Sequence, residues 1–219
     1  MFDWQDIDTV LLDMDGTLLD LAYDNHFWLE HIPTLYAHTQ NLPILEARDF
    51  IQTAMAAVAG KLDWYCIDYW SNLLEIDIAH QTQMTSSQVA LRPFVHEFLS
   101  YAKSLSKRLL LVTNAHHHVL STKMSAIELR PYFDAIVTSH DYGSAKESER
   151  FWQQLQRHHP FNPQSTVLID DNEDVLHAAE QYGIAHTITL RQPDSQQVAR
   201  LCTRYAAIHH FNELIHSAQ

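Results

Sequence analysis

The sequence predicts an α/β protein: a Rossmann-like core with a parallel sheet, carrying a helical cap inserted after the first strand. Three observations predict this fold. A short apolar run at Thr9–Leu12 ends in two aspartates, as a buried strand does at a ligand-binding sheet edge. Residues 21–92 show helical periodicity and no strand pattern. From Pro93 onward, strand and helix patterns alternate, which is typical of a parallel sheet with helices on both faces.

The inserted segment is expected to contain three amphipathic helices. Their apolar positions recur at spacings of three and four residues, and the helices are expected near 26–36, 47–60 and 62–76. Pro43 and Gly60 mark the turns between them. Three helices in succession after one strand indicate a unit packed on itself, and we therefore expect a cap at 21–92.

The remaining chain, residues 1–20 and 93–219, is expected to form the core domain. The predicted order after Pro93 is a helix at 94–105, a strand at 108–112, a helix at 116–129, a strand at 133–138, a helix at 147–156, a strand at 166–169, a helix at 174–182, a strand at 186–190 and a helix from Ser195 onward. Gly183 is the expected C-cap of the helix before the last strand.

Composition narrows the classes of function. The chain has 219 residues and a formal charge of −13, which argues against nucleic acid or an anionic membrane as a partner. Cys66 and Cys202 are too few for a disulfide framework. The first eight residues carry acids in place of the basic start of a signal peptide, and no apolar run approaches ~20 residues. These features favour a cytoplasmic location for the protein, and they do not indicate its oligomeric state.

Four groups of polar side chains follow predicted strands, and a parallel sheet brings these strand ends to one edge. Along the chain they are Asp13 with Asp15, Thr113 with Asn114, Lys146, and Asp170 with Asp171. Close carboxylates repel each other unless a cation lies between them, and oxygen-only ligands favour Mg²⁺. The four carboxylates, Asp13, Asp15, Asp170 and Asp171, are therefore the candidate metal ligands.

Each group suits a step of phosphoryl transfer. Asp13 is placed to attack phosphorus as a carboxylate nucleophile, and Asp15 to act as general acid and base. Thr113 and Asn114 offer a hydroxyl and an amide at a helix start, which favours an anion. Lys146 is a candidate clamp for phosphoryl charge. Taken singly, a Thr-Asn pair is more often a helix cap and a lysine is more often solvated, but their shared edge favours function.

The stretches Asp13-Met-Asp-Gly-Thr17, Thr113-Asn114, Lys146 and Ile169-Asp-Asp171 resemble the four signature motifs of the haloacid dehalogenase superfamily. Most members of that superfamily are Mg²⁺-dependent phosphatases. The resemblance implies that Asp13 forms an aspartyl-phosphate, that Asp15 is the general acid and base and lends its main-chain carbonyl to Mg²⁺, and that Thr113 and Lys146 hold the phosphoryl group. It also implies that Asp171 is a metal ligand, with Asp170 beside it.

Two positions bear on the subclass. Glu147 follows Lys146 where relatives often have proline, so the geometry of this loop is less well defined by the resemblance. Asp15 disfavours halide displacement, because the dehalogenating members lack a second aspartate there.

The insert is expected to choose the substrate. Trp64 and Asp68 fall on the helix face opposite the apolar stripe, where an indole stacks on a purine and a carboxylate accepts from its ring N–H. The alternative is that Trp64 packs against a neighbouring helix. The stretches 19–28, 64–70 and 113–116 resemble the bacterial GMP/IMP nucleotidases, which implies a purine nucleoside 5′-monophosphate as substrate. Asn25 and His116, within these stretches, are further candidates for substrate contact.

The histidines at 116–118 form a tight cluster, expected at the rim of the site. A zinc site made of these adjacent residues is disfavoured, because neighbours in a helix cannot easily share one ion. Two other functions stay open at this point: a sugar-phosphate phosphatase or phosphomutase, and an inactive phosphate-binding interaction module. The complete set of chemical groups argues against the inactive module.

Overall fold

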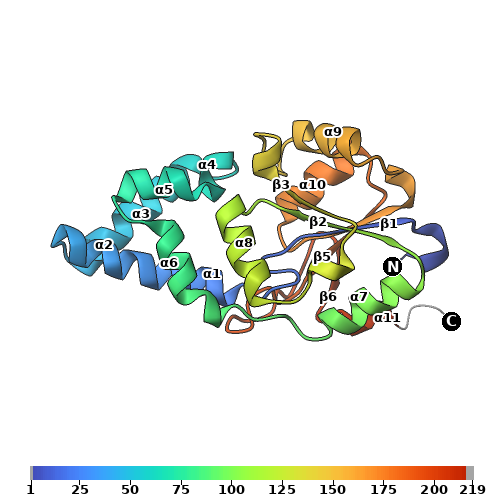
Figure 1. The fold of residues 1–219 in the computed structure, drawn as a ribbon, viewed down its shortest axis with the longest axis horizontal. Helices are drawn as coiled ribbons and strands as arrows, with labels where there is room; N and C mark the ends of the chain where they lie inside the picture. Colours follow the sequence, from blue (N-terminus) through green and yellow to red (C-terminus); the bar gives the residue numbers. More distant parts are fainter. Residues whose placement is uncertain (1, 216–219) are drawn as a thin grey trace.

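The computed structural model describes residues 2–215, and in this range the core is a six-stranded parallel sheet. The strands are β1 (Thr9–Leu12), β2 (Arg108–Thr113), β3 (Ala135–Thr138), β4 (Thr166–Ile169), β5 (His186–Leu190) and β6 (Ala206–Ile208). They lie in the order β3-β2-β1-β4-β5-β6 (Figure 1). The order reverses between β1 and β4, and such a reversal opens a ligand-binding crevice at the carboxyl ends of the two strands. The predicted fold class is confirmed.

Helices cover both faces of the sheet. Alternate residues of β1 point to opposite sides: Val10 and Leu12 pack into one apolar cluster, and Leu11 packs into another. The first cluster contains side chains from α7 (Val95–Ser104), α8 (His117–Ala126) and α11 (Asn212–Ile215). The second contains side chains from α9 (Glu149–His158) and α10 (Glu173–Tyr182). Both faces of the central strands are therefore buried, which explains why β1 and β4 are apolar apart from their first residue.

The insert follows β1 and is helical throughout. It comprises α1 (Ala22–His26), the π-helical turn η2 (Phe27–His31), α2 (Ile32–Gln40), α3 (Ile44–Val58), α4 (Leu62–Tyr65), α5 (Ile67–Leu74) and α6 (Ile78–Thr85). It has an apolar core of its own, built around Phe27, Ile51 and Trp70. Figure 1 shows these helices projecting from the sheet on the side of α8.

The chain enters and leaves the insert at adjacent points. The Asp20 N–H donates to the carbonyl of Ala90 at 2.9 Å, and the Arg92 N–H donates to the carbonyl of Leu18 at 2.9 Å. This pairing supports the proposed division into a core of residues 1–20 and 93–219 and a cap of 21–92, which stays a prediction.

Three expectations about elements were wrong or incomplete. The helix expected over 62–76 breaks at Cys66, whose extended backbone (φ −89°, ψ 105°) separates α4 from α5. The helix α6 was not expected as a separate element, because its apolar residues, Ile78, Ala79 and Met84, form no stripe at helical spacing. The segment after Ser195 is a loop followed by β6 rather than a helix, and only α11 is helical.

Short 3₁₀ turns complete the described chain: η1 (Trp4–Asp6), η3 (Ser86–Gln88), η4 (Arg130–Tyr132), η5 (Ser139–Asp141) and η6 (Pro163–Ser165). Across residues 2–215, every helix is too short or too polar to cross a membrane.

Candidate active site

Asp13 and Lys146 form a buried ion pair where the central strands end. Asp13 follows β1, and its N–H continues the ladder by donating to the carbonyl of Ile169 at 3.0 Å. The Nζ of Lys146 lies 2.5 Å from Oδ1 of Asp13 and 2.7 Å from Oδ2 of Asp170, and it also donates to the carbonyl of Val112 at 3.0 Å. Lys146 is only 2% exposed. Its ammonium is thus fixed between the strand ends by three acceptors, which suits it to hold one oxygen of Asp13 in place.

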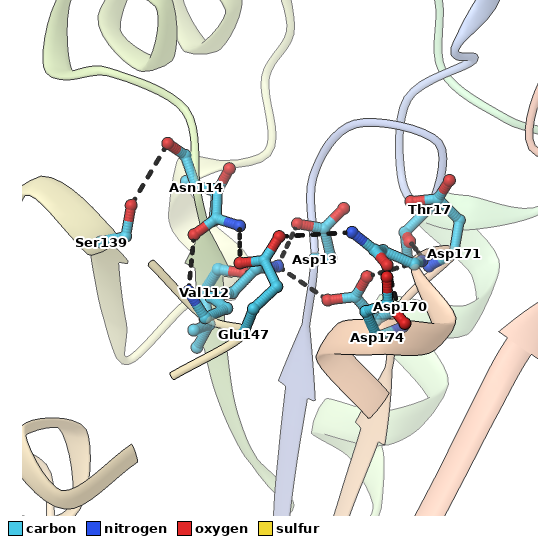
Figure 2. Close-up of polar contacts among 12 residues, drawn as sticks. Asp13, Thr17, Val112, Asn114, Ser139, Glu147, Asp170, Asp171 and Asp174 are labelled. Atoms are coloured by element: carbon cyan, nitrogen blue, oxygen red, sulfur yellow. Dashed lines mark hydrogen bonds and ion pairs between the residues drawn. The ribbon is translucent and has the colours of Figure 1, made fainter. Parts of the chain in front are cut away.

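Asp170 and Asp171 complete a carboxylate cluster with Asp13. One ligand oxygen from each of the three residues lies within 4.8 Å of the others, and Figure 2 shows them gathered at this edge of the sheet. The second oxygen of Asp170 accepts from the Asn172 N–H at 2.9 Å, and the Asp171 N–H donates to the Thr17 hydroxyl at 3.1 Å. Oxygen donors at this spacing match the preference of Mg²⁺.

The pKa values show that negative charge is in excess here. Burial raises the pKa of Asp13 well above its ordinary value, although Lys146 opposes the shift and the neighbouring aspartates add to it. Burial and the adjacent Asp170 raise the pKa of Asp171 to about 7. Burial alone would lower the pKa of Lys146, but Asp13 and Asp170 outweigh it and raise that pKa. The pKa of Asp171 stays raised although both Lys146 and Arg200 oppose the shift, and a divalent cation would supply further positive charge.

Gly16 makes room for this cluster. Its φ of +80° is in the left-handed region that glycine tolerates. A Cβ atom built at this position would lie 2.6 Å from Cγ of Asp171 and 2.7 Å and 2.8 Å from its two oxygens. The loop after β1 can therefore approach Asp171 only because residue 16 has no side chain.

Thr113 and Asn114 follow β2 and have different surroundings. The Thr113 hydroxyl accepts from the Ala115 N–H at 3.0 Å, and its side chain lines the cavity described below. The Asn114 amide is engaged with the next loop: its oxygen accepts from the Lys146 N–H at 2.9 Å, and its nitrogen donates to Glu147 at 3.0 Å. Asn114 thus positions the lysine loop, a role that the sequence did not indicate.

Asp15 contacts a lysine that sequence reasoning missed. The Nζ of Lys123, on α8, lies 2.7 Å from Asp15 and 2.6 Å from Asp24 of the insert, and Lys123 is 2% exposed. Burial opposes charge on Lys123, but the two carboxylates raise its pKa. Burial and the charge of Asp15 raise the pKa of Asp24 to about 7, with Lys123 opposing them. One buried cation therefore joins the predicted general acid to the first helix of the insert.

A cavity of about 730 Å³ lies over the carboxylates, between sheet edge and insert. It is large enough for a drug-sized ligand or cofactor. Of the predicted substrate contacts, Asn25, Trp64 and His116 line it, but Asp68 is not among its lining residues. Asp68 instead lies 3.6 Å from Nε2 of His116. The Asn25 amide donates to Asp194 at 2.6 Å, so it is already engaged with the loop after β5.

Arg200 and Tyr65 also escaped prediction. Arg200 lines the cavity and donates to the main-chain carbonyl of Asp171 at 2.8 Å, from a loop expected to be helical. The Tyr65 hydroxyl, in the insert, donates to Glu147 at 2.5 Å. Glu147 therefore links the insert to the lysine loop and to Asn114, which gives a physical reason for glutamate after Lys146.

Residues 10–189 match the family described as haloacid dehalogenase-like hydrolase. The chain is 36% identical over 214 residues to the GMP/IMP nucleotidase YrfG of Escherichia coli K12, covering 98% of this chain and 96% of that protein, and it has the same identity to YrfG of Shigella flexneri.

Solved structures share the fold. The crystal structure of a HAD phosphatase from Thermococcus onnurineus has a TM-score of 0.79 at 18% identity, covering 95% of this chain and 96% of the other. The magnesium-bound putative HAD-hydrolase YfnB from Bacillus subtilis has a TM-score of 0.66 at 22% identity, covering 96% and 97%.

Proposed function

The chain belongs to the haloacid dehalogenase-like hydrolases, and from that premise we propose that it hydrolyses purine nucleoside 5′-monophosphates with the help of Mg²⁺. Two relatives that align over nearly the whole chain, including the insert, are GMP/IMP nucleotidases. This supports purine nucleotides, GMP and IMP foremost, as the substrate class.

One observation carries the proposal: a single cavity joins the carboxylates of the sheet edge to aromatic side chains of the insert. Asp13, Asp15 and Lys146 line it from the core, and Trp28 and Trp64 line it from the insert. A phosphate bound near Asp13 leaves the rest of a nucleotide facing these indoles, and aromatic faces suit a purine.

The residues present fit Mg²⁺. Asp13, Asp170 and Asp171 offer hard oxygen donors within 4.8 Å of one another, and Gly16 leaves the space that Asp171 occupies. We propose that Asp13, Asp171 and the main-chain carbonyl of Asp15 hold the ion, with Asp170 beside it. When bound, Mg²⁺ withdraws charge from the phosphate oxygens and lets Asp13 stay ionised.

The chemistry proceeds in two displacements at phosphorus. A carboxylate oxygen of Asp13 forms a bond to phosphorus as the bond to the ester oxygen of the nucleoside breaks, and Asp15 gives that oxygen its proton. A water molecule then attacks the aspartyl-phosphate and transfers its proton to Asp15, which releases phosphate and restores Asp13. Atoms and protons balance over one turnover.

Lys146 and Thr113 assist both displacements. Lys146 donates to Oδ1 of Asp13, which fixes the orientation of the carboxylate and places a positive charge beside the transferring group. The hydroxyl proton of Thr113 is available to a phosphate oxygen, since the hydroxyl oxygen accepts from Ala115.

An assay of phosphate release from GMP by wild type and by the Asp13→Asn variant tests this proposal. Wild type should be active with Mg²⁺, silent in EDTA and active again when Mg²⁺ is restored. Asp13→Asn should lower kcat by at least about 1,000-fold, because asparagine cannot act as the nucleophile. Circular dichroism checks that the variant is folded. Full activity in EDTA, or kcat of the folded variant within about tenfold of wild type, would contradict the proposal.

A further inference from the structure

A second cluster of metal-ligating side chains lies apart from the carboxylates. Cys66 comes from the break between α4 and α5 in the insert, His116 caps the start of α8, and His140 lies in η5 after β3. One ligand atom from each lies within 4.8 Å of the others. Only His116 belongs to the run of adjacent histidines, so the objection to a site made of neighbours in a helix does not apply to this set.

Both imidazoles have a nitrogen available to a ligand. Nδ1 of His116 accepts from the His118 N–H at 3.4 Å, and its Nε2 lies 3.6 Å from a carboxylate oxygen of Asp68, which is beyond hydrogen-bond distance. Nε2 of His140 is buried and has no hydrogen-bond partner among the described residues. A buried polar atom without a hydrogen-bond partner lowers the stability of the fold by about 1–3 kcal/mol, and a bound ligand would remove this cost.

The donor set differs in kind from the carboxylate cluster. A thiolate and two imidazoles suit Zn²⁺, whereas three carboxylates suit Mg²⁺. Zinc bonds of about 2.0–2.3 Å in tetrahedral geometry place ligand atoms roughly 3.5 Å apart. The three ligand atoms lie within 4.8 Å of one another, so binding one ion requires them to approach each other by on the order of 1 Å at most.

We propose that Cys66, His116 and His140 bind one Zn²⁺ ion, and that the bound ion clamps the insert against the core. Three protein ligands leave the fourth position to water. Cys66 is contributed by the insert, and the two histidines are contributed by the core. His116 caps α8, the core helix that Figure 1 shows beside the insert. Because substrate and product pass between insert and core, zinc binding slows turnover while Mg²⁺ occupies its own site.

Titration of the reduced protein with Co²⁺ tests the site directly, with Mg²⁺ saturating. A cobalt–thiolate bond gives a near-ultraviolet charge-transfer band that oxygen and histidine ligands do not give. The band should saturate at one equivalent of Co²⁺, and Zn²⁺ should remove it. Cys66→Ser should lack the band, and His140→Ala should weaken Co²⁺ binding by at least about tenfold. Cys202→Ser is the matched control, because Cys202 is the exposed second cysteine, and it should keep the band.

A second measurement tests the clamp. At fixed Mg²⁺, the Zn²⁺ concentration that halves GMP hydrolysis should be at least about tenfold higher in Cys66→Ser than in wild type or Cys202→Ser. Absence of the band in wild type, its persistence in Cys66→Ser or its loss in Cys202→Ser would overturn the site. Equal zinc inhibition of wild type and Cys66→Ser would overturn the clamp. The spectral arm needs no enzymatic activity, so its result is independent of the proposed substrate.

Discussion

Lys146 is the cation around which the acidic side chains of the site are arranged. Asp13 and Asp170 both bind its ammonium, and Asp171 lies in the same cluster. The sequence pointed to these residues because each follows an apolar strand of a parallel sheet, and such strand ends share an edge. The sequence could not show that Asn114 holds the lysine loop, because an amide after a strand has the same pattern whether it binds a ligand or a neighbouring backbone.

Gly16→Ala is predicted to disturb the metal site through Asp171. Both Gly16 (φ +80°) and Gly60 (φ +72°) have left-handed backbones, so alanine costs about 1–2 kcal/mol at either position. Only at Gly16 does a Cβ meet Asp171, whereas nothing lies within 4 Å at Gly60. Gly16→Ala should raise the Mg²⁺ concentration for half-maximal activity by at least about tenfold, and Gly60→Ala should leave it unchanged. Equal Mg²⁺ dependence in the two variants would count against this packing argument.

Lys123 shows where residue-level prediction failed. A lysine on a helix is usually solvated, so Lys123 received no role. One signal was present: it follows Val119 and Leu120 at helical spacing and precedes Met124, which places a charge within an apolar stripe. A charge at such a position needs a buried partner, and here it has two, Asp15 and Asp24.

Asp24 is predicted to make stability depend on pH. Its pKa is about 7 in the folded protein, above the ordinary 3.8, because of burial and the charge of Asp15. Between these two pH values the folded state holds a proton on Asp24 that the unfolded state releases. The stabilisation of the folded state by this proton is fully present below pH 3.8 and is lost as the pH rises through about 7. In EDTA, Tm of Asp24→Asn should fall less than that of wild type over this window. Parallel Tm curves for the two proteins would contradict the assignment.

Among the secondary-structure elements, the buried strands were predicted more accurately than the exposed segments. β1, β2 and β4 are mainly apolar runs, β5 alternates polar and apolar residues, and each of the four lies close to its expected position. The α4–α5 break escaped notice because Cys66 keeps the apolar spacing on both sides of it. The segment 195–205 is polar with few turn residues, so its composition alone did not separate a loop from an exposed helix.

Trp64 is predicted to contact the substrate rather than only pack within the insert. Its side chain is 37% exposed and lines the cavity. Phe50, also in the insert, is 41% exposed but does not line the cavity, so Phe50→Ala is the matched control. Loss of base stacking costs about 1–3 kcal/mol, so Trp64→Ala should raise KM for GMP on the order of tenfold. KM for a small generic phosphate ester should change little in both variants. Equal effects of Trp64→Ala on both substrates would assign this tryptophan to packing.

In the described part of the chain, three hydrogen bonds between side chains tie the insert to the core around the cavity. They are Asp24 to Lys123, Tyr65 to Glu147, and Asn25 to Asp194. Each pairs residues at least 82 positions apart in the sequence, which no local pattern can reveal. The carboxylates beneath the cavity define the reaction, whereas the insert above it controls which esters reach them.

The measurement that tests this account most directly is a comparison of kcat/KM for GMP, IMP, ribose phosphate and hexose phosphates with Mg²⁺ saturating. Ribose phosphate is the matched control, because it keeps the phosphate and sugar of the nucleotide but lacks the base. The account predicts that kcat/KM for GMP and IMP exceeds that for every sugar phosphate by at least about tenfold, since only nucleotides contact the aromatic insert. Sugar phosphates turning over as fast as GMP and IMP, or faster, would contradict it.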